Sequence, residues 1–260
     1  MPNEIHATAI VHPKATLGDN IVIGPYCVVD EGVQLGDECS LGPHVHLTGQ
    51  TQIGNKNSFH SGCVIGDFPQ DLSYKGAPTR TIIGDGNTFR EHVTIHRSNS
   101  EEEATQIGSD NFFMASSHAG HNAQIGSRNV LANGTLIAGH AIIGDQVTFG
   151  GNAGVHQFSS IGRLAFLQGN SGVSQDLPPF LINSRINEVS GLNVIGMRRA
   201  GIPSAHRIEM KKLFHLVYRE GHTISQALEL AEGQFSSPPC REFLEFARNS
   251  KRGICSKLRE

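Results

Sequence analysis

Apolar residues recur at every sixth position along the first two thirds of this 260-residue chain. Counting in sixes from Ile5 to Ile65, all eleven positions are apolar, although an apolar content of 38 % would give about four by chance. The spacing resumes from Ile83 to Ile95 and again from Ile107 to Val173. The residue two positions before each of these is mostly small, and the residue after it is often glycine. Repetition of this kind indicates short units stacked in one direction.

A six-residue period with one large and one small inward residue is typical of a triangular coil made from three short parallel strands. Three such hexads close an 18-residue coil, and successive coils stack at the ~4.8 Å spacing of hydrogen-bonded strands. The pattern predicts an all-β left-handed parallel β-helix of about eight to nine coils, with the handedness taken from the known class of hexapeptide-repeat folds. Its two interruptions predict loop insertions at residues 67–80 and 97–104.

The period stops at Val173, and Pro178-Pro179 marks a boundary. We therefore expect residues 1–177 to form the β-helix and residues 178–260 to form an α-helical C-terminal domain. Helices are predicted at Ser204–Glu220, Thr223–Glu232 and Arg241–Asn249.

Charge divides along the same boundary. Residues 198–260 hold 12 basic and 7 acidic residues, within a chain whose net charge is −3. This basic segment is either a solvated surface or a docking surface for an acidic partner.

Composition excludes several classes of protein. No uncharged apolar run approaches the ~18 residues of a membrane span, and the first residues lack the basic and apolar regions of a signal peptide. Five cysteines without a CxxC spacing favour neither a disulfide framework nor a cysteine zinc site, so a cytoplasmic protein is expected. The overall charge does not suggest a nucleic-acid binder.

Histidines cluster in the later hexads. His118 and His121 lie around one turn, and one coil further on Gly139 is expected to stack on His121, with His140 beside it. An imidazole next to a backbone N–H is the arrangement that acyl transfer requires. The alternative is that these histidines are ordinary polar residues of the exterior.

Other kinds of catalytic site are less well supported. A zinc site between subunits usually takes two ligands separated by four residues, whereas His118 and His121 are separated by two. The sequence contains no nucleophile elbow and no phosphate-binding glycine motif, and we predict no metal and no cofactor. A solid prism has no internal pocket, so a cleft between subunits of a trimer is the expected place for a site.

Several longer segments carry a family resemblance. They are Gly24-Pro25-Tyr26-Cys27, Gln70-Asp71-Leu72, Pro78-Thr79-Arg80, Thr94-Ile95-His96-Arg97, Gly108-Ser109-Asp110-Asn111, His118-Ala119-Gly120-His121, Leu136-Ile137-Ala138-Gly139-His140, Val155-His156-Gln157-Phe158 and Asn193-Val194-Ile195-Gly196-Met197-Arg198-Arg199. In this order, over nearly the whole chain, they resemble the UDP-N-acetylglucosamine acyltransferases, which begin lipid A synthesis in Gram-negative bacteria. The resemblance implies a cytoplasmic homotrimer that moves a 3-hydroxyacyl chain from acyl carrier protein to the glucosamine 3-position of UDP-N-acetylglucosamine.

The resemblance also implies a role for individual residues. His121 would be the general base, and the backbone N–H of Gly139 would stabilise the oxyanion. The sugar would be held by Gln70, Asp71, His118 and His140, with His96 as a further substrate-binding residue. The diphosphate and uridine would be held by His156, Gln157, Asn193, Arg198 and Arg199, partly from the neighbouring subunit. Gly169 matches a position that limits acyl-chain length.

Two positions depart from the family pattern. Ser73 stands where a lysine usually follows Gln-Asp-Leu, with Lys75 two residues on, and Asn122 stands where an aspartate usually follows the catalytic histidine. An amide oxygen accepts an imidazole N–H but does not stabilise the imidazolium charge as a carboxylate does. These departures leave open the 3-amino analogue of the sugar nucleotide as acceptor. Three other hypotheses also stay open: another hexapeptide acyltransferase using a coenzyme A thioester, a metal-dependent lyase or carbonic anhydrase, and a non-catalytic scaffold.

Overall fold

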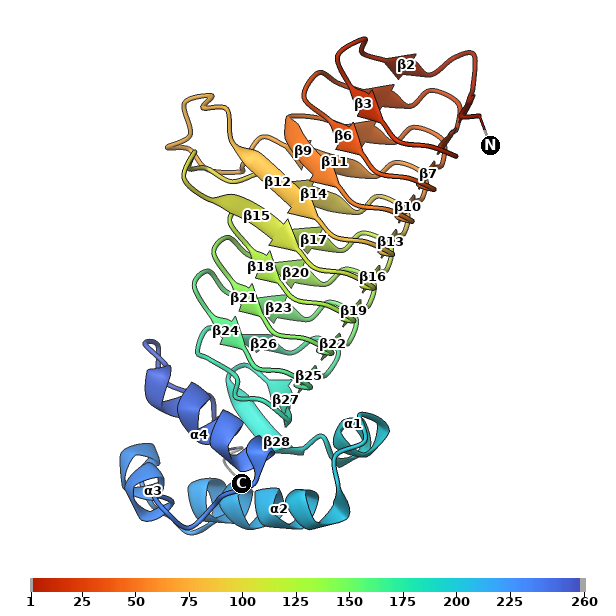
Figure 1. Cartoon of the computed structure of the whole chain (residues 1–260). Coiled ribbons are helices and arrows are strands. Elements are labelled where there is room, and N and C mark those ends of the chain that lie inside the picture. The colour runs from red at the N-terminus through yellow and green to blue at the C-terminus, as the bar shows by residue number, and fades with distance from the viewer. Residues whose placement is uncertain (1, 258–260) are drawn as a thin grey trace.

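A computed structural model describes residues 2–257 of the chain. It confirms the predicted fold class, a left-handed parallel β-helix followed by helices (Figure 1). Each face of the triangular prism is a parallel sheet, and each sheet takes every third strand of the β-helix. Hydrogen-bonded partners are therefore 18 residues apart where no loop intervenes, as for His118 and Leu136.

The strands of the β-helix have the following bounds. Sheet 1 contains β1 (Glu4–Ile5), β4 (Val22–Ile23), β7 (Ser40–Leu41), β10 (Ser58–Phe59), β13 (Thr88–Phe89), β16 (Phe112–Phe113), β19 (Val130–Leu131), β22 (Thr148–Phe149) and β25 (Phe166–Leu167). Sheet 2 contains β2 (Ile10–Val11), β5 (Val28–Val29), β8 (His46–Leu47), β11 (Val64–Asp67), β14 (Thr94–His96), β17 (His118–Ala119), β20 (Leu136–Ile137), β23 (Gly154–Val155) and β26 (Gly172–Val173). Sheet 3 contains β3 (Thr16–Leu17), β6 (Gln34–Leu35), β9 (Gln50–Ile53), β12 (Arg80–Ile83), β15 (Ala104–Ile107), β18 (Gln124–Ile125), β21 (Ile142–Ile143) and β24 (Ser160–Ile161).

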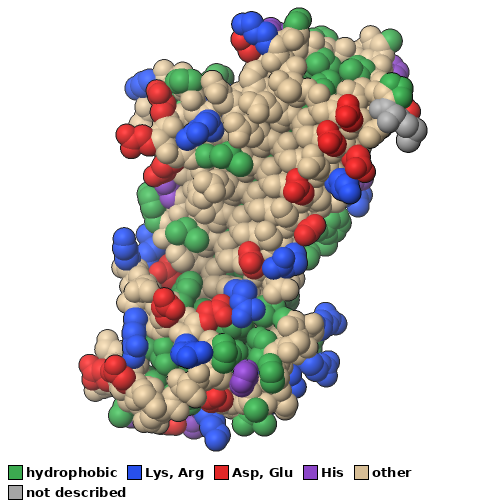
Figure 2. Space-filling view, viewed as in Figure 1, with side chains coloured by type: hydrophobic (Ala, Val, Ile, Leu, Met, Phe, Trp, Pro, Cys, Tyr) green, Lys and Arg blue, Asp and Glu red, His purple; other side chains and the backbone are tan. Residues whose placement is uncertain are grey.

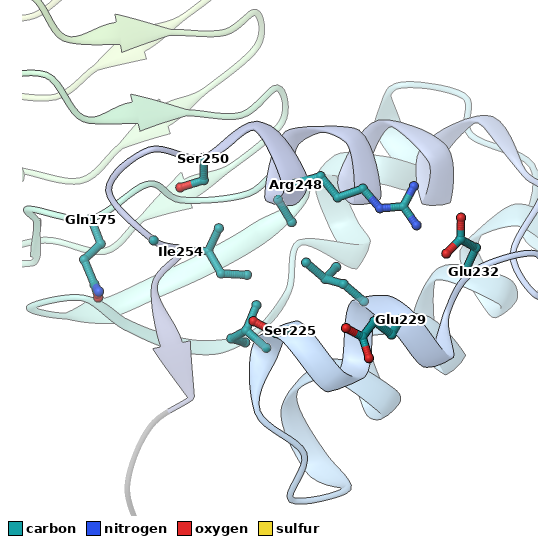
Figure 3. Close-up of a pocket in the computed structure, with 11 residues that line it drawn as sticks. Gln175, Ser225, Glu229, Glu232, Arg248, Ser250 and Ile254 are labelled. Carbon is teal, nitrogen blue, oxygen red and sulfur yellow. The ribbon is translucent and has the colours of Figure 1, made fainter.

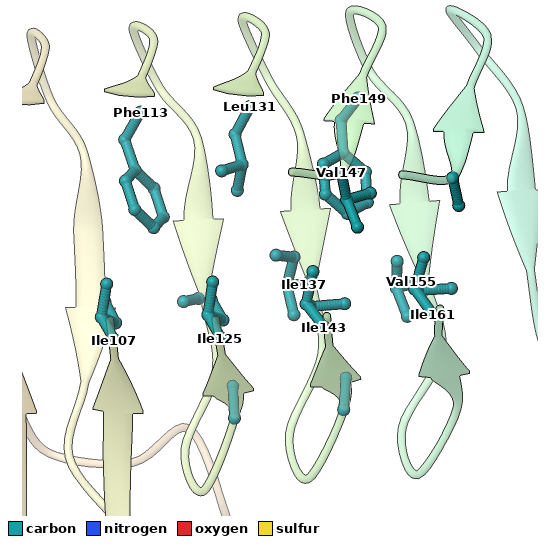
Figure 4. Packing of buried hydrophobic residues seen from close by; sticks show 14 of the residues in the cluster. Ile107, Phe113, Ile125, Leu131, Ile137, Ile143, Val147, Phe149, Val155 and Ile161 are labelled. Carbon is teal, nitrogen blue, oxygen red and sulfur yellow. The ribbon is translucent and has the colours of Figure 1, made fainter. Parts of the chain in front are cut away.

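The large residue of each hexad points into the prism and packs on its equivalents in the coils above and below (Figure 4). In sheet 1 these residues include a run of phenylalanines. The ring of Phe89 stacks at a centroid distance of 4.9 Å on Phe59 and at 5.0 Å on Phe113. Because Phe89 is fully buried, the coils are held together by apolar contact as well as by the ladders of backbone hydrogen bonds.

Replacing Phe89 by alanine is expected to lower the free energy of unfolding by about 3–5 kcal/mol, because it removes the middle ring of the stack and leaves a cavity. Phe89→Leu is the matched control and should cost less, since it leaves a smaller cavity. Urea unfolding of the three proteins at one concentration measures the difference. A loss below about 1 kcal/mol for the alanine variant would mean that the coils collapse around the missing ring.

The corner between sheets 3 and 1 carries a buried ladder of asparagines. The Oδ1 atom of Asn57 accepts from the backbone N–H of Asn87 at 2.9 Å, and the pattern repeats from Asn87 to Asn111 and from Asn111 to Asn129. Each of these asparagines stands two positions before the large inward residue of its hexad, where most hexads have a small residue. Their side chains accept from backbone N–H groups that the turn leaves without a backbone partner, so this position of the hexad also has a hydrogen-bonding role.

The chain after the last hexad first forms a hairpin and then helices. Its elements are β27 (Leu181–Arg185), β28 (Glu188–Leu192), α1 (Val194–Arg199), α2 (Ser204–Arg219), α3 (Ile224–Leu230), α4 (Pro238–Asn249) and β29 (Ser256–Lys257). The hexad period did not predict the antiparallel hairpin, in which β27 extends sheet 1 by pairing with β25. Among residues 2–257 there is no helix with the length and apolar character needed to cross a membrane.

The helices cover the C-terminal end of the prism (Figure 1). Phe180, Met210 and Phe243 are fully buried there and belong to the same apolar cluster as the inner residues of the coils. Arg163 in the last coil forms a bidentate ion pair with Glu242 of α4, and this pair connects the β-helix to the helices. The division at residues 177 and 178 stays a prediction, because one core runs through both parts.

Both loop insertions leave the prism at the corner between sheets 2 and 3. Residues 68–79 join β11 to β12, and residues 97–103 join β14 to β15 (Figure 1). The turn that holds His121 joins β17 to β18 at this same corner, in the next coil. The insertions are thus placed where their side chains can reach the histidine cluster.

Candidate active site

A groove of about 630 Å³ lies along the outer face of sheet 2. Its lining residues are Gln70, His96, His118, Gly120, His121, Leu136, Ile137, Ala138, Gly139, Gly154, Val155, His156, Gln157, Gly172, Val173, Ser174 and Ile186. In successive coils the outward position of the sheet changes from His118 to Leu136 and then to Gly154 and Gly172. The groove therefore has a polar end with imidazoles and a longer apolar floor, on which a Cβ atom built on Gly154 would meet nothing within 4 Å.

His121 lies at the sheet 2–sheet 3 corner and is only 6 % exposed. Its Nδ1 atom lies 2.9 Å from Oδ1 of Asn122, so Nδ1 carries the proton and Nε2 has a free lone pair. The Nε2 side of the ring lies against Gly139, as the 18-residue spacing predicted. A Cβ atom built on Gly139 would lie 2.7 Å from Nε2, so no other residue fits there without moving the ring.

The backbone N–H of Gly139 is a candidate oxyanion donor. It makes no hydrogen bond with any part of the chain between residues 2 and 257, although the neighbouring N–H of His140 donates to the His121 carbonyl oxygen at 3.0 Å. An unpaired donor beside a basic nitrogen, at the edge of a groove, can bind a developing negative charge while the base removes a proton.

Three further histidines surround this pair. The His140 ring meets the His121 ring edge-on at 5.1 Å and stacks on Phe158 at 4.7 Å. The His96 and His118 rings meet edge-on at 5.0 Å, and His118 Nδ1 lies 2.8 Å from the Thr94 hydroxyl. The structure thus brings together four of the histidines that the sequence singled out.

Burial keeps these neighbouring histidines uncharged at neutral pH. It lowers the pKa of His118 to about 4 and also lowers the pKa of His96. The pKa of His140 is lowered chiefly by burial and secondly by His121. Neutral imidazoles beside His121 are suited to hydrogen-bond hydroxyl groups of a ligand and add no positive charge next to the base.

The low pKa of His118 has a consequence for stability. Because the unfolded chain binds this proton near pH 6.5 and the folded chain only near pH 4, acidification through this window favours unfolding, by roughly 3 kcal/mol in total for this group. His118→Gln, which cannot titrate, should show a flatter decline in the free energy of unfolding between pH 6.5 and 4. Denaturant titrations of both proteins at several pH values across that range measure the free energy of unfolding. The same dependence on pH in both proteins would contradict the expectation.

Asp71 of the first insertion lies close to the imidazole cluster. Its Oδ2 atom accepts from the Asn99 side chain at 2.7 Å, and its Oδ1 atom accepts from the backbone N–H and the hydroxyl of Ser73, each at 2.8 Å. The Asn99 amide and the Ser73 donors lower the pKa of Asp71 to about 2. Ser73, which departs from the family pattern, therefore fixes the orientation of this carboxylate.

Six residues named from the sequence do not line this groove: Asp71, His140, Gly169, Asn193, Arg198 and Arg199. Gly169 lies at the opposite corner of sheet 2, where a Cβ atom on it would meet Gly151. Asn193 caps α1, accepting from the Gly196 N–H at 2.9 Å, and Arg198 and Arg199 are exposed in the last turn of that helix. His156 and Gln157 do line the groove.

Sequence reasoning missed the residues of the second insertion. Ser98, Asn99 and Glu103 all contact Asn122, next to the predicted base. The interruption at 97–104 was visible in the sequence, and its place in the coil puts it at the corner of His121. The position of the interruption within its coil was therefore the signal that could have found these residues, because it indicates which corner of the prism the loop leaves.

A second hollow, of about 610 Å³, lies between α3 and α4 and is shown in Figure 3. Glu229, Glu232 and Arg248 line it together with apolar residues. No histidine lies among its described lining residues, so this hollow does not repeat the imidazole arrangement of the groove. Across residues 2–257, His, Cys, Asp and Glu side chains form no group of three or more that could hold a metal ion.

A β-helix of hexapeptide repeats with a histidine and a free N–H beside an external groove defines an acyltransferase of the hexapeptide-repeat class. A family profile described as Udp N-acetylglucosamine O-acyltransferase, domain 2, matches residues 176–255. A relative from Anaeromyxobacter dehalogenans (strain 2CP-1 / ATCC BAA-258), named acyl-[acyl-carrier-protein]--UDP-N-acetylglucosamine O-acyltransferase, is 40 % identical over 253 residues, covering 96 % of this chain and 98 % of the relative. The chain therefore belongs to the UDP-N-acetylglucosamine O-acyltransferase family.

Solved structures agree with this assignment. The UDP-N-acetylglucosamine acyltransferase of Francisella novicida superposes with a TM-score of 0.92 at 33 % identity, covering 97 % of this chain and 94 % of that one. The enzyme of Bacteroides fragilis 9343 gives a TM-score of 0.92 at 35 % identity, covering 96 % and 99 %. The similarity thus extends over both the β-helix and the helices.

Proposed function

We propose that this chain transfers a 3-hydroxyacyl group from acyl carrier protein to the glucosamine 3-hydroxyl of UDP-N-acetylglucosamine, the first step of lipid A biosynthesis. The observation that carries the proposal is the contact between the His121 imidazole and Gly139, whose N–H is unpaired within the described chain. Relatives at 40 % identity, named for this reaction, support the choice of substrates.

The reaction follows from the geometry of that pair. Nε2 of His121 removes the proton of the sugar hydroxyl as its oxygen attacks the thioester carbonyl carbon. The Gly139 N–H donates to the oxyanion of the tetrahedral intermediate, a contribution of about 3–4 kcal/mol in other acyl-transfer enzymes. Collapse of the intermediate breaks the carbon–sulfur bond, and the imidazolium returns its proton to the departing thiolate. The products are the 3-O-acyl sugar nucleotide and free carrier protein.

The groove is suited to an amphipathic pair of substrates. We assign the sugar to Gln70, Asp71, His96, His118 and His140, and the acyl chain to the apolar floor that begins at Leu136. The diphosphate and uridine are assigned to His156, Gln157, Asn193, Arg198 and Arg199, because a planar guanidinium matches phosphate oxygens. Gly169 is assigned to the end of the acyl path.

These assignments require a second copy of the chain. Asn193, Arg198 and Arg199 do not line the groove of their own chain, so we propose a homotrimer in which a neighbour supplies them. Leu136 and Ile186 are 55 % and 74 % exposed beside the groove in the single chain, and a neighbour would cover them. Sedimentation equilibrium measures the oligomeric state.

Acyl carrier protein is proposed to dock on the helical end of the molecule. Lysine and arginine side chains gather there in Figure 2, and the exposed ones include Lys211, Lys212, Arg241, Arg248, Lys251 and Arg252. Such a surface attracts an acidic partner. We also place the enzyme in the cytoplasm, since Cys27, Cys39, Cys63, Cys240 and Cys255 are all buried and unpaired.

Mass spectrometry of the reaction products tests the proposal. The purified protein receives a mixture of 3-hydroxyacyl carrier proteins with UDP-N-acetylglucosamine, and in parallel with the 3-amino analogue of that sugar nucleotide. A third reaction supplies the acyl groups as coenzyme A thioesters. The expected product is the 3-O-acyl sugar nucleotide, formed from the carrier-protein thioester.

Each alternative result has a defined meaning. Product from the 3-amino analogue alone would keep the reaction class and replace the acceptor, giving an amide. Product from coenzyme A thioesters alone would replace the donor. No product from any combination would overturn the proposed function.

A further inference from the structure

Asn122 creates a difficulty for the proposed base. A carboxylate has two equivalent oxygens, but the amide of asparagine has one acceptor and one donor, and either can face a histidine. If Nδ2 faced His121, the imidazole would have to accept at Nδ1 and carry its proton on Nε2, which could then no longer remove a proton from the substrate. In a serine protease, the aspartate-to-asparagine change next to the catalytic histidine produces this wrong tautomer and lowers kcat about 10⁴-fold.

The surroundings of Asn122 exclude the wrong orientation. The backbone N–H of Asn99 donates to Oδ1 at 3.0 Å, and a backbone N–H cannot become an acceptor. On the other side of the amide, Nδ2 donates to the carboxylate of Glu103. An ionised carboxylate can accept hydrogen bonds but cannot donate them.

Ser98 adds a third constraint. Its hydroxyl oxygen accepts from Nδ2 of Asn122 at 2.8 Å, while its own proton is directed to the Ser100 carbonyl oxygen at 2.9 Å. Asn122 and Ser98 are 3 % and 0 % exposed, so water does not replace these partners. A flipped amide would place two donors together at Asn99 and two acceptors together at Glu103.

We propose that Glu103 is a positioning residue for the proposed transfer reaction, acting through Asn122. By accepting from Nδ2 it holds Oδ1 toward His121, and this keeps the Nε2 lone pair of His121 directed at the substrate. The inference rests on the proposed function, because it assigns Glu103 to the same base. It also explains how a chain with asparagine next to the base retains the productive tautomer.

The role of Glu103 is geometric more than electrostatic. Its side chain is 56 % exposed, so its charge is screened by water and adds little to the stability of the imidazolium. What an exposed carboxylate does supply is an acceptor that cannot donate. The prediction therefore depends on the hydrogen-bonding type of the side chain at position 103, and not on its charge.

A series of substitutions at Glu103 tests this dependence. Glutamine can still accept through Oε1, so Glu103→Gln should keep most of kcat. Glu103→Ala removes the acceptor and should lower kcat about tenfold. Glu103→Lys offers a donor that favours the flipped amide, and it should lower kcat further, by about a hundredfold. KM for the sugar nucleotide should change less than kcat, because Glu103 contacts the proposed sugar-binding residue His140 only at 3.9 Å, between Oε2 and Nδ1. Glu102→Ala, an exposed neighbour in the same loop, is the control.

The same substitution in an Asn122→Asp background separates positioning from a purely structural role. An aspartate at this position has no amide to orient, so adding Glu103→Ala there should no longer lower kcat. An equal tenfold loss in both backgrounds would overturn the proposal and make Glu103 a support of the loop alone. A glutamine variant as poor as the alanine variant would also overturn it.

The tautomer can be read without activity. Nitrogen-15 NMR of ring-labelled histidine, with the His121 signals assigned from His121→Gln, should show neutral His121 protonated at Nδ1 in the unmodified protein. In Glu103→Lys the Nε2-protonated form should be present. If the unmodified protein forms no acylated product but its tautomer responds in this way, the proposed function fails and the positioning role stands. A tautomer that does not respond would overturn the positioning role.

Discussion

His121→Ala is expected to lower kcat for acyl transfer by about 10³-fold and to leave KM for the sugar nucleotide nearly unchanged. A positioned general base contributes typically 10²–10⁴-fold, and no other imidazole of the cluster can replace it. The rings of His96 and His118 contact each other, and His140 stacks on Phe158, whereas the His121 ring lies against Gly139. The residual rate should then reflect substrate binding and the proposed oxyanion donor alone.

Single-turnover assays with a matched control measure this effect. His6→Ala removes an exposed imidazole from the first coil, where its hydrogen bond is to Thr8, and should leave kcat unchanged. Thermal unfolding of both variants checks that the fold is retained. A His121→Ala protein with more than about a tenth of the original kcat would show that the base lies elsewhere.

Gly139→Ala is expected to be nearly as damaging, although it adds only a methyl group. The new Cβ atom would lie 2.7 Å from Nε2 and 2.8 Å from Cε1 of His121, closer than van der Waals contact allows. The ring must therefore move away from the proposed oxyanion donor, and a misplacement of about 1 Å costs on the order of 10²-fold in rate. Crowding of the Gly139 N–H by the methyl group should increase the loss further.

Gly191→Ala is the matched control, because a Cβ atom on Gly191 in β28 would meet nothing within 4 Å. It should retain full activity, whereas Gly139→Ala should lose at least about 10²-fold in kcat. A crystal structure of the Gly139 variant should show a displaced imidazole. Unchanged activity together with an unmoved ring would remove Gly139 from the proposed mechanism.

Much of the candidate site could be predicted because the fold is periodic. Once the hexad is recognised, adding 18 to a residue number gives its neighbour in the next coil, and this arithmetic alone places Gly139 against His121. The large inward residues could be predicted in the same way, since Phe89 and its equivalents recur at the same position of each hexad. Residue spacing is sufficient to place these side chains because the parallel strands pair in register, which fixes the neighbour of each residue in the next coil.

What could not be predicted lies where the period is broken. The hairpin of β27 and β28 depends on pairing with β25, a tertiary contact with no local signal. The contacts of Asn99 and Glu103 with Asn122 depend on the path of the 97–103 loop, which spacing does not determine. For Arg198 and Arg199 the limit is different, because the position of α1 relative to a neighbouring groove is a property of the assembly.

The two ends of the prism differ in a way that affects its dynamics. Ile5, an inward residue of the first coil, is 46 % exposed, whereas its register partner Ile23 in the second coil is 1 % exposed. Each coil of such a stack is stabilised only by its nearest neighbours, so opening begins at the uncovered N-terminal end and becomes progressively costlier along the axis. Amide hydrogen exchange should therefore slow from the first coil toward the helices. The histidine cluster, several coils from the fraying end, would keep its geometry while the far end of the molecule opens and closes.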